Sequence, residues 1–116
     1  MNKYTELSDF EINKKVAEAL SYKFTVNGDF VFISANVPQG IVPYSVTFDP
    51  CNNPADAWQL ILEAKLSIHP DFNNDCESWI VRNIHIPMVN EAKLSRGISI
   101  AYLLMKDAEN ENNNNG

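Results

Sequence analysis

Residues 49–58, with the sequence DPCNNPADAW, place turn residues directly before a helix start. Asn53 suits the N-cap because its side-chain oxygen can accept from an early backbone N–H. Pro54 suits the first helical position, where its missing N–H would be unpaired, and Asp56 suits the positively polarised first turn. We therefore predict a helix over residues 54–66. Its apolar residues cover more than one narrow stripe, which predicts burial on two sides.

A second helix start lies at Ser8. Glu11, three residues later, completes a capping box, and Leu7 with Ile12 forms a hydrophobic staple. The apolar face of the helix that follows is made by Ile12, Val16, Ala19 and Leu20. On the other side we expect Asn13, Lys14, Lys15 and Glu18 to lie in water.

A third helix is predicted by apolar residues at helical spacing: Leu94, Ile98, Ala101, Tyr102 and Met105. Gly97 lies within it, and a glycine there costs about 1 kcal/mol relative to alanine, which points to close backbone packing. Residues 109–116 are polar, rich in asparagine and without apolar anchors. We expect them to form a disordered tail.

Strand segments are predicted between the helices. Residues 22–26 and 29–33 are rich in β-forming side chains and flank Asn27-Gly28, a dipeptide typical of tight hairpins. Residues 44–48 and 78–86 are two further strand segments.

Two segments read as loops. Residues 34–43 contain two prolines and a glycine, which favour an irregular surface loop, and residues 69–75 read as a connection. The resulting order, α-β-β-β-α-β-α, predicts an α+β fold in a single domain over residues 1–108. It consists of a small, mainly antiparallel sheet of about four strands packed with three helices.

The charge of the chain excludes one class of function. With a net charge of -6, it lacks the clustered Lys and Arg that general nucleic-acid binding requires. Its first residues have no apolar core typical of an export signal, and no apolar stretch is long enough to span a membrane. We expect a soluble cytoplasmic protein in which Cys51 and Cys76 are free thiols.

No residue pattern indicates catalysis. His69 and His85 fall in different segments without evident acid–base partners, so surface or structural roles are favoured. Cys51 precedes a helix start, which could lower the pKa of its thiol, but no histidine lies nearby in sequence and a turn-forming role is favoured. A zinc site is not supported, because short Cys-Cys or His-His spacing is missing. We predict no catalytic residue, no metal site and no cofactor.

A ligand cleft is predicted where the proline-rich loop and the turn before residue 54 converge. Trp58 and Trp79 sit in apolar segments, which favours core positions, although an exposed ring would serve as a ligand platform. Helix N-termini and arginines can hold a small anion, and the alternative for the arginines is pairing with acidic side chains. The predicted ligand-binding residues are Tyr44, Ser45, Asn52, Asn53, Trp58, Arg82 and Arg96.

Residues 7–13 and 49–58, followed by a Trp-bearing strand and an apolar last helix, resemble the NinX-type small proteins of lambdoid phages and prophages. The chain is more distantly similar to phage domains described as α-β-α sandwiches. The resemblance implies a small cytoplasmic protein made in phage-infected or prophage-bearing bacteria, and it brings no established catalytic residues. The chain departs from shorter members around residues 33–43 and 83–90.

By analogy with small phage proteins that counter host defence, we expect a binding protein that sequesters a nucleotide-derived immune signal without cleaving it. The signal would be a cyclic oligonucleotide or an ADP-ribose derivative, enclosed by a homo-oligomer. The alternative is a protein-interaction inhibitor that docks on a host or phage enzyme. A hydrolase that degrades the signal is a third class, disfavoured by the missing acid–base pair. No general nucleic-acid or membrane partner is expected.

Overall fold

The computed structural model describes residues 2–115, which form three α-helices and two three-stranded antiparallel sheets. The helices are α1 (Asp9–Ala19), α2 (Pro54–Ala64) and α3 (Leu94–Asn115). Sheet A consists of β1 (Phe24–Asn27), β2 (Phe30–Ser34) and β3 (Ser45–Thr47). Sheet B consists of β4 (Ser67–Pro70), β5 (Trp79–Arg82) and β6 (Val89–Glu91), with the 3-10 helix η1 (Phe72–Asn74) between β4 and β5.

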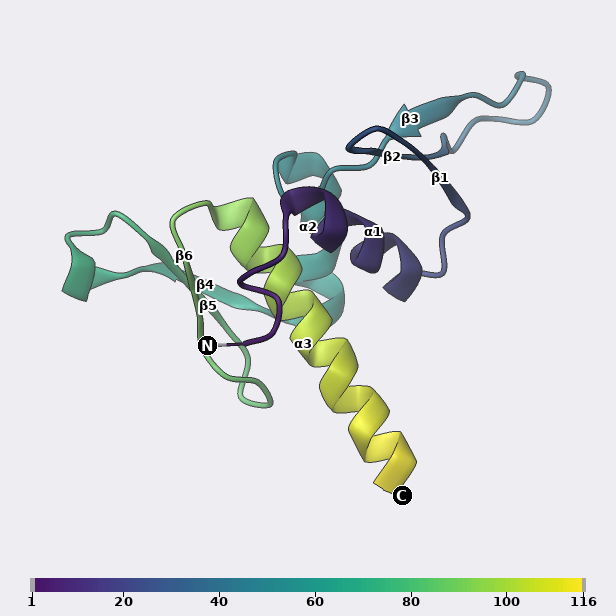
Figure 1. The fold of residues 1–116 in the computed structure, drawn as a ribbon. Coiled ribbons are helices and arrows are strands. Elements are labelled where there is room, and N and C mark those ends of the chain that lie inside the picture. Colours follow the sequence, from purple (N-terminus) through teal and green to yellow (C-terminus); the bar gives the residue numbers. More distant parts are fainter. Residues whose placement is uncertain (1, 116) are drawn as a thin grey trace.

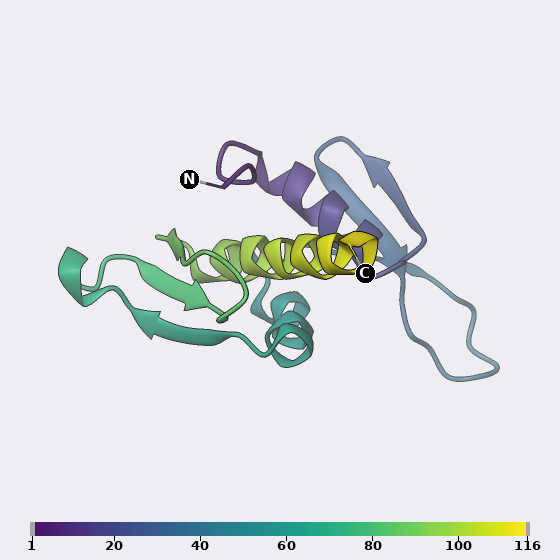
Figure 2. The same ribbon diagram turned by 90° about the horizontal axis from the view of Figure 1, so that it is seen from below.

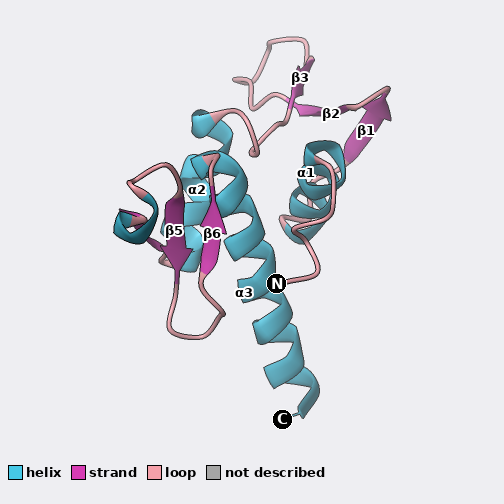
Figure 3. Ribbon diagram, turned by 60° about the vertical axis from the view of Figure 1, so that its left-hand side comes forward, coloured by secondary structure: helices cyan, strands magenta, loops and turns pink. Residues whose placement is uncertain are grey.

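Helix α3 lies at the centre of this arrangement, and its C-terminal part projects beyond the other elements (Figure 1). Helix α1 packs on one side of α3, and α2 with sheet B packs on the other (Figure 2). Sheet A lies beyond α1, away from sheet B (Figure 3). Within residues 2–115, no helix has the length and apolar character needed to cross a bilayer.

The predicted helix starts are confirmed. The Ser8 hydroxyl accepts from the Glu11 N–H at 3.1 Å, and the Asn53 side-chain oxygen accepts from the Ala55 N–H at 3.0 Å. Pro54 opens α2 as expected. The helix ends at Ala64, two residues before the predicted position, because the next residue adopts a left-handed conformation with φ 53°.

The strands divide between two sheets instead of forming one, which corrects the predicted four-stranded arrangement, while the α+β class and the three helices are confirmed in the described residues. Strands β4 and β6 were not predicted. Pro70 lies on an edge strand, where its missing N–H removes no ladder bond. Strand β5 ends at Arg82 instead of residue 86. The following Asn83 donates from its side chain to the Ala64 carbonyl at 3.1 Å, which ties the chain to the end of α2.

The core forms where α1, α2 and sheet B meet α3. The predicted face of α3 is buried at Ile98, Ala101 and Tyr102. A Cβ atom added at Gly97 would lie 3.3 Å from both the Glu91 Cβ and a Val81 methyl group, so the glycine lets sheet B approach α3 closely.

Helix α3 continues through Asn115, so residues 109–115 are helical where we expected a disordered tail. No proline or glycine interrupts the helix after Gly97 until Gly116, which lies outside the described residues. Lys106 also forms an ion pair with Glu109 at 3.4 Å, one turn further on. Such a pair supports continuation of a helix beyond its packed part.

Candidate functional site

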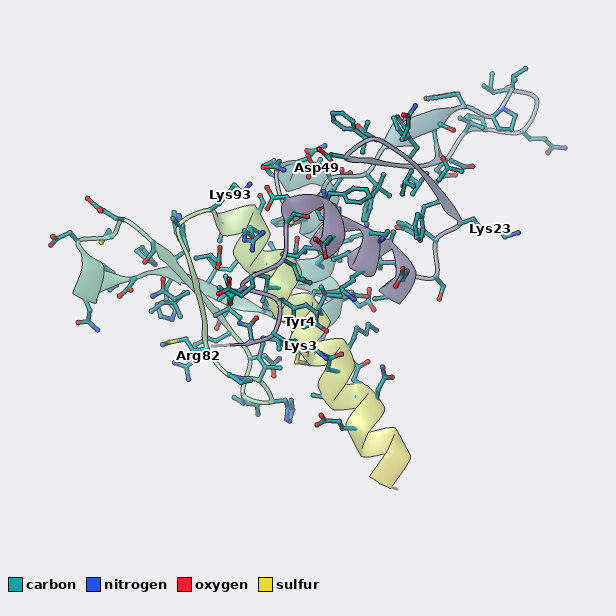
Figure 4. All side chains as sticks on the ribbon, viewed as in Figure 1. Lys3, Tyr4, Lys23, Asp49, Arg82 and Lys93 are labelled. Carbon is teal, nitrogen blue, oxygen red and sulfur yellow. The ribbon has the colours of Figure 1, made fainter. Side chains whose placement is uncertain are left out.

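The predicted ligand residues do not converge on one cleft. Tyr44 lies just before β3 and Ser45 at its start. Trp58 lies on the outer face of α2, and Arg82 at the end of β5. Figure 4 shows Arg82 well away from Asp49, which is in the same turn as Asn52. Asn53 is engaged as the cap of α2. The ligand roles assigned to these residues stay predictions.

Asn52 and Arg96 do come together, through Asp9. Arg96 donates to the Asp9 carboxylate at 2.7 Å and to the Glu91 carboxylate at 3.1 Å. Lys93 bridges Asp9 and the side-chain oxygen of Asn52. We call these residues the Arg96 cluster: Asp9, Asn52, Glu91, Lys93 and Arg96.

The guanidinium group of Arg96 is bonded to neighbouring groups of the protein. Besides the two carboxylates, it donates to the carbonyl oxygens of Thr5 and Leu7 at 2.9 and 2.8 Å, and its side chain is 14% exposed. It therefore joins the N-terminal segment to the start of α3. This is the paired arrangement that the sequence left open as the alternative to anion binding.

The stabilisation that the Arg96 cluster gives to the fold depends on pH, because the Asp9 carboxyl ionises. Burial raises the pKa of the Asp9 carboxyl, but hydrogen bonds from Lys93 and Arg96 outweigh that effect and hold the pKa below its ordinary value of 3.8. A carboxyl whose pKa is lower in the folded than in the unfolded protein stabilises the fold at pH values above its unfolded-state pKa. This stabilisation is lost as the pH falls through the folded-state pKa.

We therefore expect the free energy of unfolding to fall below about pH 4, and to fall less steeply there in an Asp9→Asn variant. Urea unfolding across the acid range measures both. Asp29→Asn is the control, because no described residue forms a hydrogen bond or ion pair with the Asp29 side chain. An Asp9→Asn variant with the wild-type acid slope would contradict this expectation.

The turn before α2 is fixed to α1 by Asn13, a residue that we expected in water and that is buried. Its amide donates to the Asp49 carboxylate at 2.7 Å, and its oxygen accepts from the Cys51 N–H at 3.0 Å. Cys51 is buried as well, and burial raises the pKa of its thiol to about 12. The thiol is therefore protonated near neutral pH.

Beside this turn is a hollow of about 380 Å³, between the first turn of α1, the start of β2 and residues 47–52. We call it the acid–aromatic hollow, defined by Asp9, Asp29, Asp49, Phe10, Phe30 and Asn52. Three carboxylates line it, and no Lys or Arg is among the described residues that do. Its lining suits a cation better than an anion.

Apolar side chains are exposed on α2, on sheet A with its loop, and around sheet B at Phe72, Ile84 and Met88. Trp58 on α2 is 61% exposed, so neither its expected core position nor two-sided burial of the helix is correct. The buried face of α2 consists of Ala57, Leu60 and Ala64, and Trp58 points about 100° away from Ala57. The exposed apolar residues of sheet A and its loop are Val26, Phe30, Ile41, Val42, Tyr44 and Val46.

The polar side chains considered for metal binding or catalysis are separate. His69 lies on β4, His85 in the loop after β5, and Cys76 in the turn before β5. In residues 2–115, no group of three or more His, Cys, Asp or Glu side chains is placed to hold a metal ion.

Fold and hollow together define a small acidic α+β protein with a carboxylate-lined surface pocket. The chain belongs to the family described as Bacteriophage P22, NinX, whose model matches residues 3–106. This confirms the resemblance seen in residues 7–13 and 49–58. Comparison with curated proteins and with solved structures gave no match.

Proposed function

We propose that this phage protein acts in the cytoplasm of the bacterial host by docking on a basic surface of another protein, without catalysis. The acid–aromatic hollow is the observation that carries this proposal. Its volume of about 380 Å³ is sufficient for a Lys or Arg side chain of a partner. A net charge of -6 would also speed encounter with a basic partner.

The three carboxylates in the hollow differ in whether they are already bonded to other side chains. Asp9 and Asp49 are already bonded to neighbouring side chains, whereas the Asp29 carboxylate is engaged by no described residue. The adjacent residue, Phe30, is 59% exposed. A carboxylate beside an exposed ring suits a guanidinium or ammonium group, which pairs with the one and stacks on the other.

Sequestration of an anionic nucleotide has less support. Arg96 is bonded to four acceptor groups, and Lys93 is paired with Asp9. Arg82 and Trp58 remain available but lie on different elements. A nucleotide phosphate at the hollow would face the carboxylates of Asp29 and Asp49, and the two cations bonded to lining residues, Lys93 and Arg96, are already paired with Asp9.

The test places the photoreactive residue p-benzoylphenylalanine at position 30 and illuminates the protein in phage-infected cells. We expect cross-linking to a defined protein. The Asp29→Lys substitution should reduce the amount of cross-linked product about tenfold. In a lysate illuminated in the same way, raising the salt concentration from about 0.05 to 0.5 M should have a similar effect. Glu18→Lys makes the same charge change on an exposed position of α1 outside the hollow and should leave the product intact. If both variants lose the cross-linked product equally, the effect comes from net charge alone, and the proposal that the partner docks at the hollow is overturned.

A second arm tests the nucleotide hypothesis directly. The protein is incubated with cyclic oligonucleotides and ADP-ribose derivatives, filtered, and then heat-denatured. A signal that is depleted and returns intact would replace docking by sequestration, and one that returns altered would indicate an enzyme. We expect no depletion.

A further inference from the structure

Residues 30–48 contain no Asp, Glu, Lys, Arg or His, although 21% of the whole chain is charged. They form β2, the long loop and β3. Strand β2 packs on α1, and the loop extends away from the helices (Figure 1). Several of their apolar side chains are exposed, including Ile41, Val42 and Tyr44. An uncharged, apolar extension on an acidic protein is a surface suited to contact.

Strand β3 is an edge of sheet A, because the strand order is β1-β2-β3. The Tyr44 carbonyl accepts from the Ala35 N–H at 2.8 Å, so Tyr44 and, two residues on, Val46 direct their main-chain groups to β2. In an antiparallel ladder the alternate residues face the other way. Ser45 and Thr47 therefore direct their N–H and C=O groups to the open edge.

Natural sheet edges are usually protected by charges or proline. Strand β1 is preceded by Lys23, β4 contains Pro70, and β6 contains Glu91. Strand β3 has no charge within it or beside it. Pro43 lies before the strand and leaves both outward-facing residues free to pair.

We propose that two copies of this chain pair through antiparallel β3 strands, joining their A sheets into one across a twofold axis at Val46. In this register Ser45 exchanges main-chain hydrogen bonds with Thr47 of the second copy, and Thr47 with the second copy's Ser45. The two Val46 side chains face each other, and each Tyr44 ring lies diagonally next to the second copy's Val46.

A second copy fits this edge better than another strand for two reasons. The register is self-complementary, since each copy supplies the donors and acceptors that the other needs. Two chains that each carry -6 repel one another, and the uncharged segment 30–48 lets them meet with their charges turned away. The acid–aromatic hollow borders this edge at Thr47, and a dimer with a twofold axis would carry two hollows.

Disulfide cross-linking tests the register. A Val46→Cys variant in a Cys76→Ser background places two thiols across the axis in a non-hydrogen-bonded pair, where the Cα separation suits a disulfide. Val26→Cys is the matched control, because Val26 lies on the other edge of the same sheet and is 50% exposed, against 37% for Val46. We expect the Val46→Cys dimer to form at least about tenfold faster under mild oxidation. Equal rates would overturn the proposal.

Mass measurement tests the association itself. By light scattering at about 0.1 mM we expect the wild type at twice 13.1 kDa and Val46→Lys at 13.1 kDa, since two ammonium groups would face each other across the axis. Val26→Lys should remain a dimer. A monomeric wild type, or a dimer unaffected by Val46→Lys, would overturn the proposal. If Val46→Lys does not fold, as judged by circular dichroism, the cross-linking comparison decides.

Discussion

Replacing Arg96 by methionine is expected to lower the free energy of unfolding by roughly 3 kcal/mol, which urea denaturation at neutral pH would measure. The substitution keeps an unbranched side chain but removes every donor. The Asp9 and Glu91 carboxylates then lose their shared cation, and the carbonyls of Thr5 and Leu7 lose their partner. Breaking one member of a largely buried ionic network costs more than the network contributes, because the remaining charges stay desolvated.

The other arginine is the matched control. Arg82 is exposed, and no described residue engages its guanidinium group. Arg82→Met should therefore change the free energy of unfolding by less than about 0.5 kcal/mol. Arg96→Lys should fall between the two, because an ammonium group retains the charge but cannot reach four acceptors in a planar fork. Equal effects at positions 82 and 96 would show that the Arg96 cluster does not stabilise the fold.

Replacing Asn13 by leucine is expected to cost roughly 2 kcal/mol of unfolding free energy. Leucine has a similar volume but leaves the buried Cys51 N–H without its acceptor and removes the amide that donates to Asp49. Hydrogen exchange gives a local readout, since the Cys51 amide should lose protection in the variant. Lys15→Leu, at an exposed position of the same helix, should change stability by less than about 0.5 kcal/mol.

A protected Cys51 amide in the Asn13→Leu protein would contradict this explanation even if stability fell. It would mean that the turn before α2 is held in place without Asn13. The stability loss would then come from strain in α1.

Local chemistry made part of the fold predictable. Ser8 and Asn53 act within two or three residues of the N–H groups that they cap, and the hairpin depends on Gly28, whose φ is 61°. Such signals lie in adjacent residues and need no tertiary information. Helical spacing identified part of the buried surface of α3, at Ile98, Ala101 and Tyr102. It missed Ser99, Ile100 and Leu103, which are buried as well because α1, α2 and sheet B all pack on this helix.

The remainder depends on contacts between distant segments. Asn13 has the spacing of a solvent-facing residue, and its burial follows from residues 49–51 folding over it. The pairing of Arg96 with Asp9 joins residues 87 positions apart. The hollow likewise combines α1, β2 and a turn, so its predominance of carboxylates could not be read from any one segment.

Helix α3 is synthesised after every element that packs on it. Until residues 94–105 leave the ribosome, the faces of α1 and sheet B that pack on α3 lack this helix, and we expect Ile12, Val16 and Val81 to be more accessible to water than in the complete fold. We therefore expect the earlier segments to be only partly folded at this stage and the fold to be completed in a late step. A nonsense codon between β6 and α3 would release a chain with its apolar interior exposed, a substrate for cellular proteases.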